Sequence, residues 1–201
     1  MIQIQTILLA AGSGSRFGGD KLIAPLPDGT PLVLASARVL VAAGCDVLAV
    51  VRDADSGAVP QLTSLPSVRV LVCPESASGL GHSLACGVRH SQAANAWLVM
   101  LADMPFIRPD TIACVASALA QGARLVAPTR AGRRGHPVGF AREWRDQLVA
   151  LTGDAGARAL LTEQSDALTL VETDDPGILR DVDRRRDLDE CPHAVPAVDL
   201  D

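Results

Sequence analysis

The 201-residue sequence is poor in aromatic residues, with two tryptophans, three phenylalanines and no tyrosine. It also lacks an excess of basic residues, because its net charge is −5 at neutral pH. Surfaces that bind nucleic acids combine basic stripes with aromatic stacking platforms. The composition therefore argues against a nucleic acid as partner.

Long hydrophobic runs are also missing. No run approaches the ~20 residues that span a bilayer, so no membrane segment is expected. The N-terminus lacks a basic region and a cleavage site, since the apolar segment Thr6–Ala11 leads directly into a glycine-rich stretch. We therefore expect a cytoplasmic protein that does not associate with membranes.

The cysteines and histidines show no metal-ligand spacing. The cysteines are odd in number, widely spaced and without a C-x-x-C pair: Cys45, Cys73, Cys86, Cys114 and Cys191. Most lie in or beside apolar runs, where a free cysteine behaves as a small hydrophobic residue. This pattern predicts a reducing compartment and no structural zinc.

Short, nearly continuous apolar runs alternate with helical stretches. Such runs are typical of strands buried on both faces of a parallel sheet. The alternation predicts an α/β fold, a single three-layer α/β/α domain with a mostly parallel, Rossmann-like sheet over residues 1–190, followed by a flexible tail over 191–201. Val138–Phe140 is expected as an added edge strand. The other expected strands are Thr6–Ala11, Val47–Val51, Val68–Val72, Trp97–Leu101, Leu125–Ala127 and Ala167–Val171.

Local sequence signals predict four helices. One helix is expected after Thr30 as N-cap, with Pro31 as its first residue and Gly44 just past its end. A second is expected from Asp110 to near Gly122, with one apolar face. Two more are expected over roughly Ser83–Gln92 and Arg142–Leu151.

The segment 7–21 is an apolar strand that runs into a glycine-rich loop with two cations, Arg16 and Lys21. Glycines let the backbone approach a polyanion closely, and the cations neutralise its charge, so the segment predicts a phosphate-binding loop rather than a plain surface turn. Neither the P-loop nor the dinucleotide-binding fingerprint matches its glycine spacing. The candidate nucleotide-binding residues here are Leu9, Ala10, Ala11, Gly12, Ser13, Gly14, Ser15, Arg16 and Lys21.

Three carboxylates are candidate metal ligands. Asp103 follows the strand Trp97–Leu101, where it is placed to hold Mg²⁺ against phosphate oxygens; the alternative is a turn aspartate bonded to its own backbone. Asp181 and Asp183 flank Val182, so an extended segment puts both carboxylates on one face. They either supply a second ligand or form a solvated rim beside the following arginines.

Further polar loops are expected near the same edge of the sheet. The Gly79–Ser83 segment, which contains the candidate nucleotide-binding residues Gly81 and Ser83, could wrap a base or ribose, with Ser83 as a helix N-cap. His136 lies in a glycine-bracketed loop whose chemistry the residue types alone do not define. Asp154 is expected to cap a helix, and Arg158 could reach an anion.

Several motifs occur together in a fixed order: Leu-Leu-Ala-Ala-Gly-Ser-Gly-Ser-Arg-Phe-Gly-Gly-Asp-Lys, Leu-Ala-Asp-Met-Pro, Gly-His-Pro-Val, Gly-Asp-Ala-Gly-Ala-Arg and Asp-Val-Asp. Over roughly residues 5 to 190 the chain resembles the nucleotidyltransferases of molybdenum cofactor maturation. The resemblance implies the nucleotide-diphospho-sugar transferase type of fold, a triphosphate on the first loop, and catalytic roles for Lys21, Arg16 and Asp103. It also implies Mg²⁺ on Asp103, with Asp183 preferred over Asp181 as second ligand.

The sequence departs from the family pattern at Phe17, where methionine is usual, and at Arg184–Arg186, which replace Thr-Pro-Glu. Within the family, Ala11 and the Gly135-His136-Pro137 loop resemble the cytidylyl branch. The resemblance therefore implies transfer of CMP from CTP to a molybdopterin-type cofactor, with a client molybdoenzyme as a further partner and His136, Asp154 and Arg158 on the cofactor side. The alternatives are a guanylyl or other nucleotidyltransferase for a different phosphorylated substrate, and a carrier that delivers cofactor to an apo-molybdoenzyme.

Overall fold

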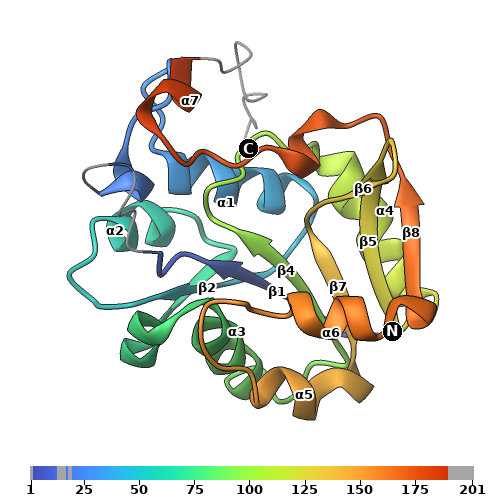
Figure 1. Ribbon diagram of the computed structural model, residues 1–201. Helices are drawn as coiled ribbons and strands as arrows, with labels where there is room; N and C mark the ends of the chain where they lie inside the picture. Colours follow the sequence, from blue (N-terminus) through green and yellow to red (C-terminus); the bar gives the residue numbers. More distant parts are fainter. Residues whose placement is uncertain (1, 13–16, 18–19, 190–201) are drawn as a thin grey trace.

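The computed structural model describes residues 2–12, 17 and 20–189 and forms three layers around one sheet (Figure 1). The strand order is β3-β2-β1-β4-β7-β5-β6, and β8 pairs with β5. β1, β2, β3 and β4 are parallel, β7 is antiparallel to both β4 and β5, and β8 is parallel to β5. The strands are β1 Ile4–Leu9, β2 Val47–Val51, β3 Val68–Val72, β4 Ala96–Leu101, β5 Leu125–Arg130, β6 Arg133–Arg134, β7 Val138–Ala141 and β8 Leu168–Glu172.

Helices cover both faces of the sheet. α1, α2 and α4 lie on one face, whereas α3, α5 and α6 lie on the other (Figure 1). The helices are α1 Leu32–Ala42, α2 Ala58–Thr63, α3 Leu80–Arg89, α4 Pro109–Ala120, α5 Arg145–Val149, α6 Arg158–Glu163 and α7 Arg185–Asp189. Short 3₁₀ turns are η1 Lys21–Ile23, η2 Pro74–Ser78, η3 Arg142–Trp144, η4 Ser165–Ala167 and η5 Pro176–Leu179. None of the described helices is long and apolar enough to cross a membrane.

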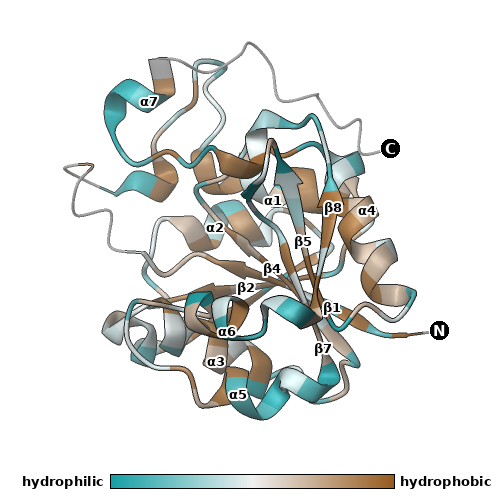
Figure 2. Ribbon diagram, turned by 45° about the vertical axis from the view of Figure 1, so that its right-hand side comes forward, coloured by the Kyte–Doolittle hydropathy of each residue, from teal (hydrophilic) through white to brown (hydrophobic). Residues whose placement is uncertain are grey.

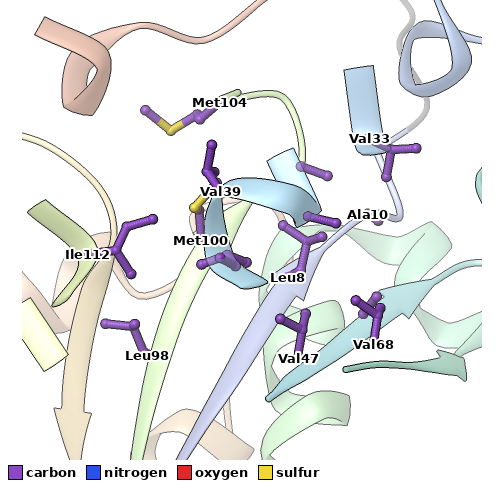
Figure 3. Packing of buried hydrophobic residues seen from close by; sticks show 14 of the residues in the cluster. Leu8, Ala10, Val33, Val39, Val47, Val68, Leu98, Met100, Met104 and Ile112 are labelled. Carbon is purple, nitrogen blue, oxygen red and sulfur yellow. The ribbon is translucent and has the colours of Figure 1, made fainter. Parts of the chain in front are cut away.

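The central strands are buried on both faces because successive side chains point to opposite sides. In β1, Leu8 packs into the cluster under α1 and α4, whereas Ile7 and Leu9 pack into the cluster under α3. Leu98 and Met100 of β4 join Leu8 in the first of these clusters (Figure 3). The same pattern appears in the hydropathy colouring, which is brown along β1, β2 and β4 and teal on the outer helices α5 and α7 (Figure 2).

The three-layer fold and the expected strands are confirmed, with two corrections. Val138–Phe140 is not an edge strand, because β7 is inserted between β4 and β5, where Phe140 pairs with both Trp97 and Leu125. The expectation that β8 is buried on both faces is also wrong. It lies at the margin of the sheet, and its Leu170 is 53% exposed.

The helix boundaries also differ from the expected caps. Pro31, not Thr30, is the N-cap of α1, and α3 begins after Gly79, so Ser83 lies inside its first turn. Ala157, not Asp154, precedes α6. The helix expected from Asp110 is confirmed as α4, with Pro109 in its first turn. Side-chain capping bonds are absent at all three corrected sites, where the backbone sets the helix start.

The cysteines correct a further expectation. Cys73, at the start of η2, and Cys86, in α3, form a disulfide, although the sequence predicted reduced thiols. The chain turns back between β3 and α3 and brings these two buried residues together, which spacing alone does not reveal. Cys45 and Cys114 are free, while Cys191 and the expected tail over 191–201 lie outside the described residues.

Candidate functional site

A cavity of about 340 Å³ opens at the carboxyl ends of β1 and β4. Ligands bind at this edge in open α/β sheets because the loops that follow parallel strands converge there. The end of β1 lines it on one side, η2 and the start of α3 on another, and the loop after β4 on a third. The cavity thus brings together three segments that the sequence singled out.

An acidic cluster borders the cavity. One carboxylate oxygen from each of Asp103, Asp181 and Asp183 lies within 4.8 Å of the others. The backbone N–H of Val182 donates to the carbonyl of Asp103 at 2.9 Å, which fastens the two segments together. Oδ1 of Asp103 is buried and has no hydrogen-bond partner in the described part of the chain. Converging carboxylates with such an oxygen fit a hard divalent cation.

Lys21 links two of these carboxylates. Its ammonium lies 2.8 Å from Oδ2 of Asp103 and 3.1 Å from Oδ1 of Asp183, and its side chain is only 11% exposed. The Asp20 side chain accepts from the Leu22 N–H and caps η1, which fixes the start of the turn that carries Lys21. Burial lowers the pKa of Lys21, but the charges and hydrogen bonds of Asp103 and Asp183 raise it above its ordinary value. Lys21 is therefore held as an ammonium.

Asp181 is the carboxylate of the cluster whose pKa is raised. Burial raises the pKa of Asp181, and the neighbouring charges of Asp183 and Asp103 raise it further, while a backbone hydrogen bond and Lys21 oppose the shift. A cation in the cluster would favour the ionised form, because it offsets the repulsion among like charges.

The start of α3 packs tightly against the loop before α6. The Gly81 N–H donates to the Gly153 carbonyl at 2.8 Å, and the Gly153 N–H donates to Nδ1 of His82 at 3.2 Å. A β-carbon on Gly81 would lie 2.7 Å from the Thr152 carbonyl oxygen, so this approach requires glycine. The contact brings Asp154 to the wall of the cavity.

His136 lies beside a second cavity rather than in the first. The backbone N–H of His136 donates to the Ile178 carbonyl at 3.0 Å, which ties the loop of His136 to the segment that leads to Asp181. Burial lowers the pKa of His136 to about 4; the charge of Asp181 opposes this shift and that of Arg134 adds to it. His136 is therefore neutral at physiological pH. Arg158 lines the same second cavity.

The predicted site residues are largely brought together. Leu9, Ala11, Gly12, Lys21, Ser83, Asp103 and Asp154 line the first cavity. Ala10 is buried beneath it and Gly81 supports its wall, while Ser13, Gly14, Ser15 and Arg16 lie outside the described residues. Gly79 and Leu80 of the predicted loop also line the cavity, whereas sequence reasoning did not single out Leu22, Arg52, Ser76, Ala77 and Leu101. Arg52 follows β2 directly, a position that could have flagged it.

The comparisons with known proteins show the family and the fold. The model of the MobA-like NTP transferase domain matches residues 6–168. A nicotine blue oxidoreductase of Paenarthrobacter nicotinovorans is 31% identical over 191 residues, which cover 88% of this chain and 90% of that protein. The purine catabolism protein PucB of Bacillus subtilis (strain 168) is 29% identical over 94% of this chain and 96% of its own length.

Solved structures confirm the expected nucleotide-diphospho-sugar transferase type of fold. The structure of Rv0371c from Mycobacterium tuberculosis H37Rv superposes with a TM-score of 0.77 at 26% identity and covers 94% of this chain and 96% of that one. A structure of the same mycobacterial protein in complex with manganese gives a TM-score of 0.69 over 85% of this chain and 88% of that one, at 24% identity.

Proposed function

The chain belongs to the MobA-like NTP transferase family, and from that premise we propose that it transfers CMP from CTP to a molybdopterin-type molybdenum cofactor. The observation that carries this proposal is the cluster of Asp103, Asp181 and Asp183 around Lys21, beside a cavity at the carboxyl edge of the sheet. An ammonium and a carboxylate cluster together suit a triphosphate and its metal ion.

In the proposed reaction, an ionised phosphate oxygen of the acceptor attacks the α-phosphorus of CTP. A new P–O bond forms, the bond between the α-phosphorus and the bridging oxygen breaks, and pyrophosphate leaves with that oxygen. The acceptor is already ionised, so no general base is required. Catalysis then rests on positioning and on neutralisation of charge.

Mg²⁺ is the metal ion that we propose for the cluster, with Asp103 and Asp183 as main ligands and Asp181 as a further one. The unpartnered Oδ1 of Asp103 supports this assignment, as does the manganese complex of Rv0371c. When bound, the ion supplies positive charge to the phosphates.

In this proposal Lys21 binds carboxylates when no metal ion is present and phosphates when one is bound. Without metal its ammonium neutralises Asp103 and Asp183, as the distances of 2.8 and 3.1 Å indicate. With a divalent cation on these carboxylates, Lys21 is released to bind the phosphates. The loop residues Ser13, Gly14, Ser15 and Arg16 are proposed to bind the same phosphates.

We assign the nucleobase to the side of the cavity lined by Ala11 and Ser83, with Gly81 behind this wall. The preference for CTP rests on the Ala11 methyl group, which narrows the space beside the base, and on the resemblance to the cytidylyl branch. GTP is the alternative. The wall formed by Gly79 and Leu80 faces the same cavity.

A second candidate function comes from the nicotine blue oxidoreductase, because 31% identity over most of both chains is substantial. An oxidoreductase would consume a reductant such as NADH or NADPH. Nucleotidyl transfer is preferred because a cluster of three carboxylates beside an ammonium serves phosphate and metal chemistry.

The test is release of pyrophosphate from CTP by the full chain with Mg²⁺ and molybdenum cofactor. Asp103→Asn should abolish turnover, because the amide is a poorer metal ligand, yet retain much of the CTP affinity. Asp166→Asn, an exposed aspartate just before β8, is the matched control and should keep full activity. Wild-type turnover without the metal, or unchanged turnover in Asp103→Asn, would contradict the proposal. Oxidation of NADPH without pyrophosphate release would favour the second candidate.

A further inference from the structure

The short helix α7 begins two residues after the last carboxylate of the acidic cluster, Asp183. Within α7, Oδ2 of Asp187 accepts two backbone N–H groups, from Asp183 at 2.9 Å and from Arg184 at 2.7 Å. Hydrogen bonds from backbone N–H groups to a carboxylate are charge-assisted and therefore stronger than neutral ones. The backbone of Asp183 is thus held from within α7.

Asp183 depends on this support because its side chain is 43% exposed, against 20% for Asp103. An exposed carboxylate that is not fixed samples several rotamers. On the other side of Asp183, the buried Val182 donates its backbone N–H to the Asp103 carbonyl at 2.9 Å. Bonds to Asp103 and to Asp187 therefore fix the backbone before and at Asp183, whose Oδ1 lies 3.1 Å from the Lys21 ammonium.

The same helix contacts the glycine-rich loop. The guanidinium carbon of Arg185 lies 5.2 Å from the centroid of the Phe17 ring, within the range of a cation–π interaction. Phe17 follows Arg16 in the loop sequence, is only 4% exposed, and packs in one cluster with Val182, against which Leu188 of α7 also packs. Figure 1 shows α7 beside the segment that leads from β1 to α1. One short helix therefore contacts both the loop and the backbone of the acidic cluster.

We propose that Asp187 and Arg185 are positioning residues. Asp187 holds Asp183 in place for a divalent cation, and Arg185 holds Phe17, and with it the glycine-rich loop, beside the same cluster. Neither side chain touches the nucleotide or the metal ion. The inference rests on the proposed function, because it takes the acidic cluster as the metal site and the loop as the triphosphate site.

The test of Asp187 is Mn²⁺ binding to the full chain without nucleotide, followed by the electron paramagnetic resonance signal of the free ion. Asp187→Ala removes the acceptor and should weaken Mn²⁺ binding at least about tenfold, as is usual when the hydrogen-bond partner of a metal ligand is lost. Asp187→Asn keeps a side-chain carbonyl oxygen that can accept both N–H groups, so it should restore most of the affinity. Asp166→Ala removes an exposed carboxylate from η4 and is the matched control.

The two variants separate position from charge. Equal losses in Asp187→Ala and Asp187→Asn would show that Asp187 acts through its charge, and wild-type affinity in Asp187→Ala would show that it does not position Asp183. Either result, or the absence of Mn²⁺ binding by wild type, would overturn the inference. Circular dichroism checks the fold. If Asp187→Ala does not fold, Asp187→Glu, which keeps the charge but displaces the accepting oxygen, replaces it and should bind Mn²⁺ more weakly than Asp187→Asn.

The test of Arg185 is a double-mutant cycle with Phe17, measured as CTP affinity by calorimetry with Mg²⁺. Arg185→Gln should weaken CTP binding about two- to fivefold in the wild-type background, the usual worth of an exposed cation–π contact. In the Phe17→Leu background it should have no further effect, because the ring is gone. Arg186→Gln makes the same charge change at the next residue, which is 71% exposed, and should bind CTP normally. An equal loss in both backgrounds would show that Arg185 binds the phosphates directly, and no loss in either would show that it positions nothing; each would overturn its positioning role.

The failure of this inference and that of the proposed function are distinguishable. If Asp187→Ala weakens Mn²⁺ binding and Asp187→Asn restores it, but molybdenum cofactor and CTP release no pyrophosphate, the proposed function is wrong and the positioning role stands. If pyrophosphate is released and Asp187→Ala binds Mn²⁺ as wild type does, the inference is wrong and the proposed function stands.

Discussion

At the scale of single residues, Lys21 is the most informative side chain, because it is the only lysine in the sequence. We predict that Lys21→Ala weakens CTP binding by roughly 1.5–3 kcal/mol, the usual worth of a charge-assisted contact, without unfolding the protein. Titration calorimetry of wild type and variant with CTP and Mg²⁺ measures the difference. Equal affinities would remove Lys21 from the triphosphate site.

Because Lys21 is the only lysine, the ionisation of its side chain can be followed directly. Reductive methylation with ¹³C gives one side-chain amine signal in the NMR spectrum besides that of the chain's α-amino group. Burial lowers the pKa of Lys21, but the two carboxylates raise it above the ordinary 10.5, so the Asp103→Asn variant should titrate at lower pH than wild type. The same signal should shift when Mg²⁺ is added, as the ammonium leaves the carboxylates.

His136 predicts a dependence of stability on pH. Burial lowers its pKa from 6.5 to about 4 in the folded protein. The unfolded chain therefore takes up a proton first as the pH falls, so stability is lost between about pH 6.5 and 4. Between pH 7 and pH 5 this loss amounts to about 2 kcal/mol, which His136→Asn should remove. Urea denaturation at pH 7 and pH 5 measures it, and the exposed His90→Asn variant serves as control. Identical pH profiles for wild type and His136→Asn would refute the assignment.

The residues of the site differ in how far the sequence predicts them. Asp103 and the glycine-rich loop stand directly after apolar strands, and such positions collect at one edge of a parallel sheet whatever the strand order. Arg52 also follows a strand directly, and this position is the signal that could have identified it. The partners of Lys21 depend on tertiary contacts, because Asp183 comes from the far end of the chain.

At the scale of secondary-structure elements, Gly12, which follows β1, and Gly81, in the first turn of α3, have different structural roles. A β-carbon on Gly12 would meet no atom of the described residues within 4 Å, whereas one on Gly81 would lie 2.7 Å from the Thr152 carbonyl oxygen. We therefore predict that Gly12→Ala keeps its stability within about 0.5 kcal/mol but loses CTP affinity. Gly81→Ala should instead lose about 1–3 kcal/mol of stability, because the loop at Thr152 must move.

Urea denaturation and CTP titration of both glycine variants separate these effects. Each variant is the control of the other, since both add one methyl group beside the same cavity. A destabilised Gly12→Ala with normal CTP affinity would show that this glycine serves the fold rather than the ligand.

The disulfide constrains the element that carries one wall of the nucleotide cavity. Cys73 and Cys86 enclose η2 and the first turns of α3. Closing a loop of this length restricts the unfolded chain, so reduction should cost up to about 3 kcal/mol of stability. Thermal unfolding with and without dithiothreitol measures the loss, and Cys114→Ser should respond as wild type does. Insensitivity of wild type to the reductant would contradict the prediction.

Strands made of continuous apolar runs are the elements that the sequence predicts well. β2, which is buried throughout, matches the run Val47–Val51, and the edge strand β3 matches the run Val68–Val72, although its Val72 is 42% exposed. The position of β7 could not be predicted, because an apolar strand of four residues carries no information about its neighbours. Its insertion between β4 and β5 is decided by long-range pairing, with Gly139 leaving room for Val126 and Leu119.

At the scale of the whole molecule, the candidate functional segments lie at the carboxyl edge of the sheet, and the apolar core lies on the two faces of its central strands. The loops after β1, β3 and β4 line one cavity, although they are separated by helices in the sequence. The acidic cluster completes this edge, since Val182 bonds to the Asp103 backbone. A ligand at this edge therefore contacts segments that must separate when the chain unfolds, and its binding should stabilise the fold as a whole.

The coupling between ligand binding and stability can identify the nucleotide. A ligand that binds only the folded chain stabilises it by about 2.7 kcal/mol at one hundred times its Kd, which corresponds to a rise in Tm of roughly 5–10 °C for a domain of this size. With Mg²⁺ present, CTP should raise the Tm more than UTP, GTP or ATP at equal concentration.

Ala11→Gly should narrow the difference in Tm shift between CTP and GTP. Removing the methyl group makes room for a purine, and a change of this size alters binding free energies by about 1–3 kcal/mol. The Asp103→Asn variant controls for metal effects: its shift with CTP should depend less on Mg²⁺ than that of wild type. A larger shift with GTP than with CTP in wild type would reverse the base assignment. Equal shifts in wild type and Ala11→Gly would mean that base selection does not depend on the Ala11 methyl group.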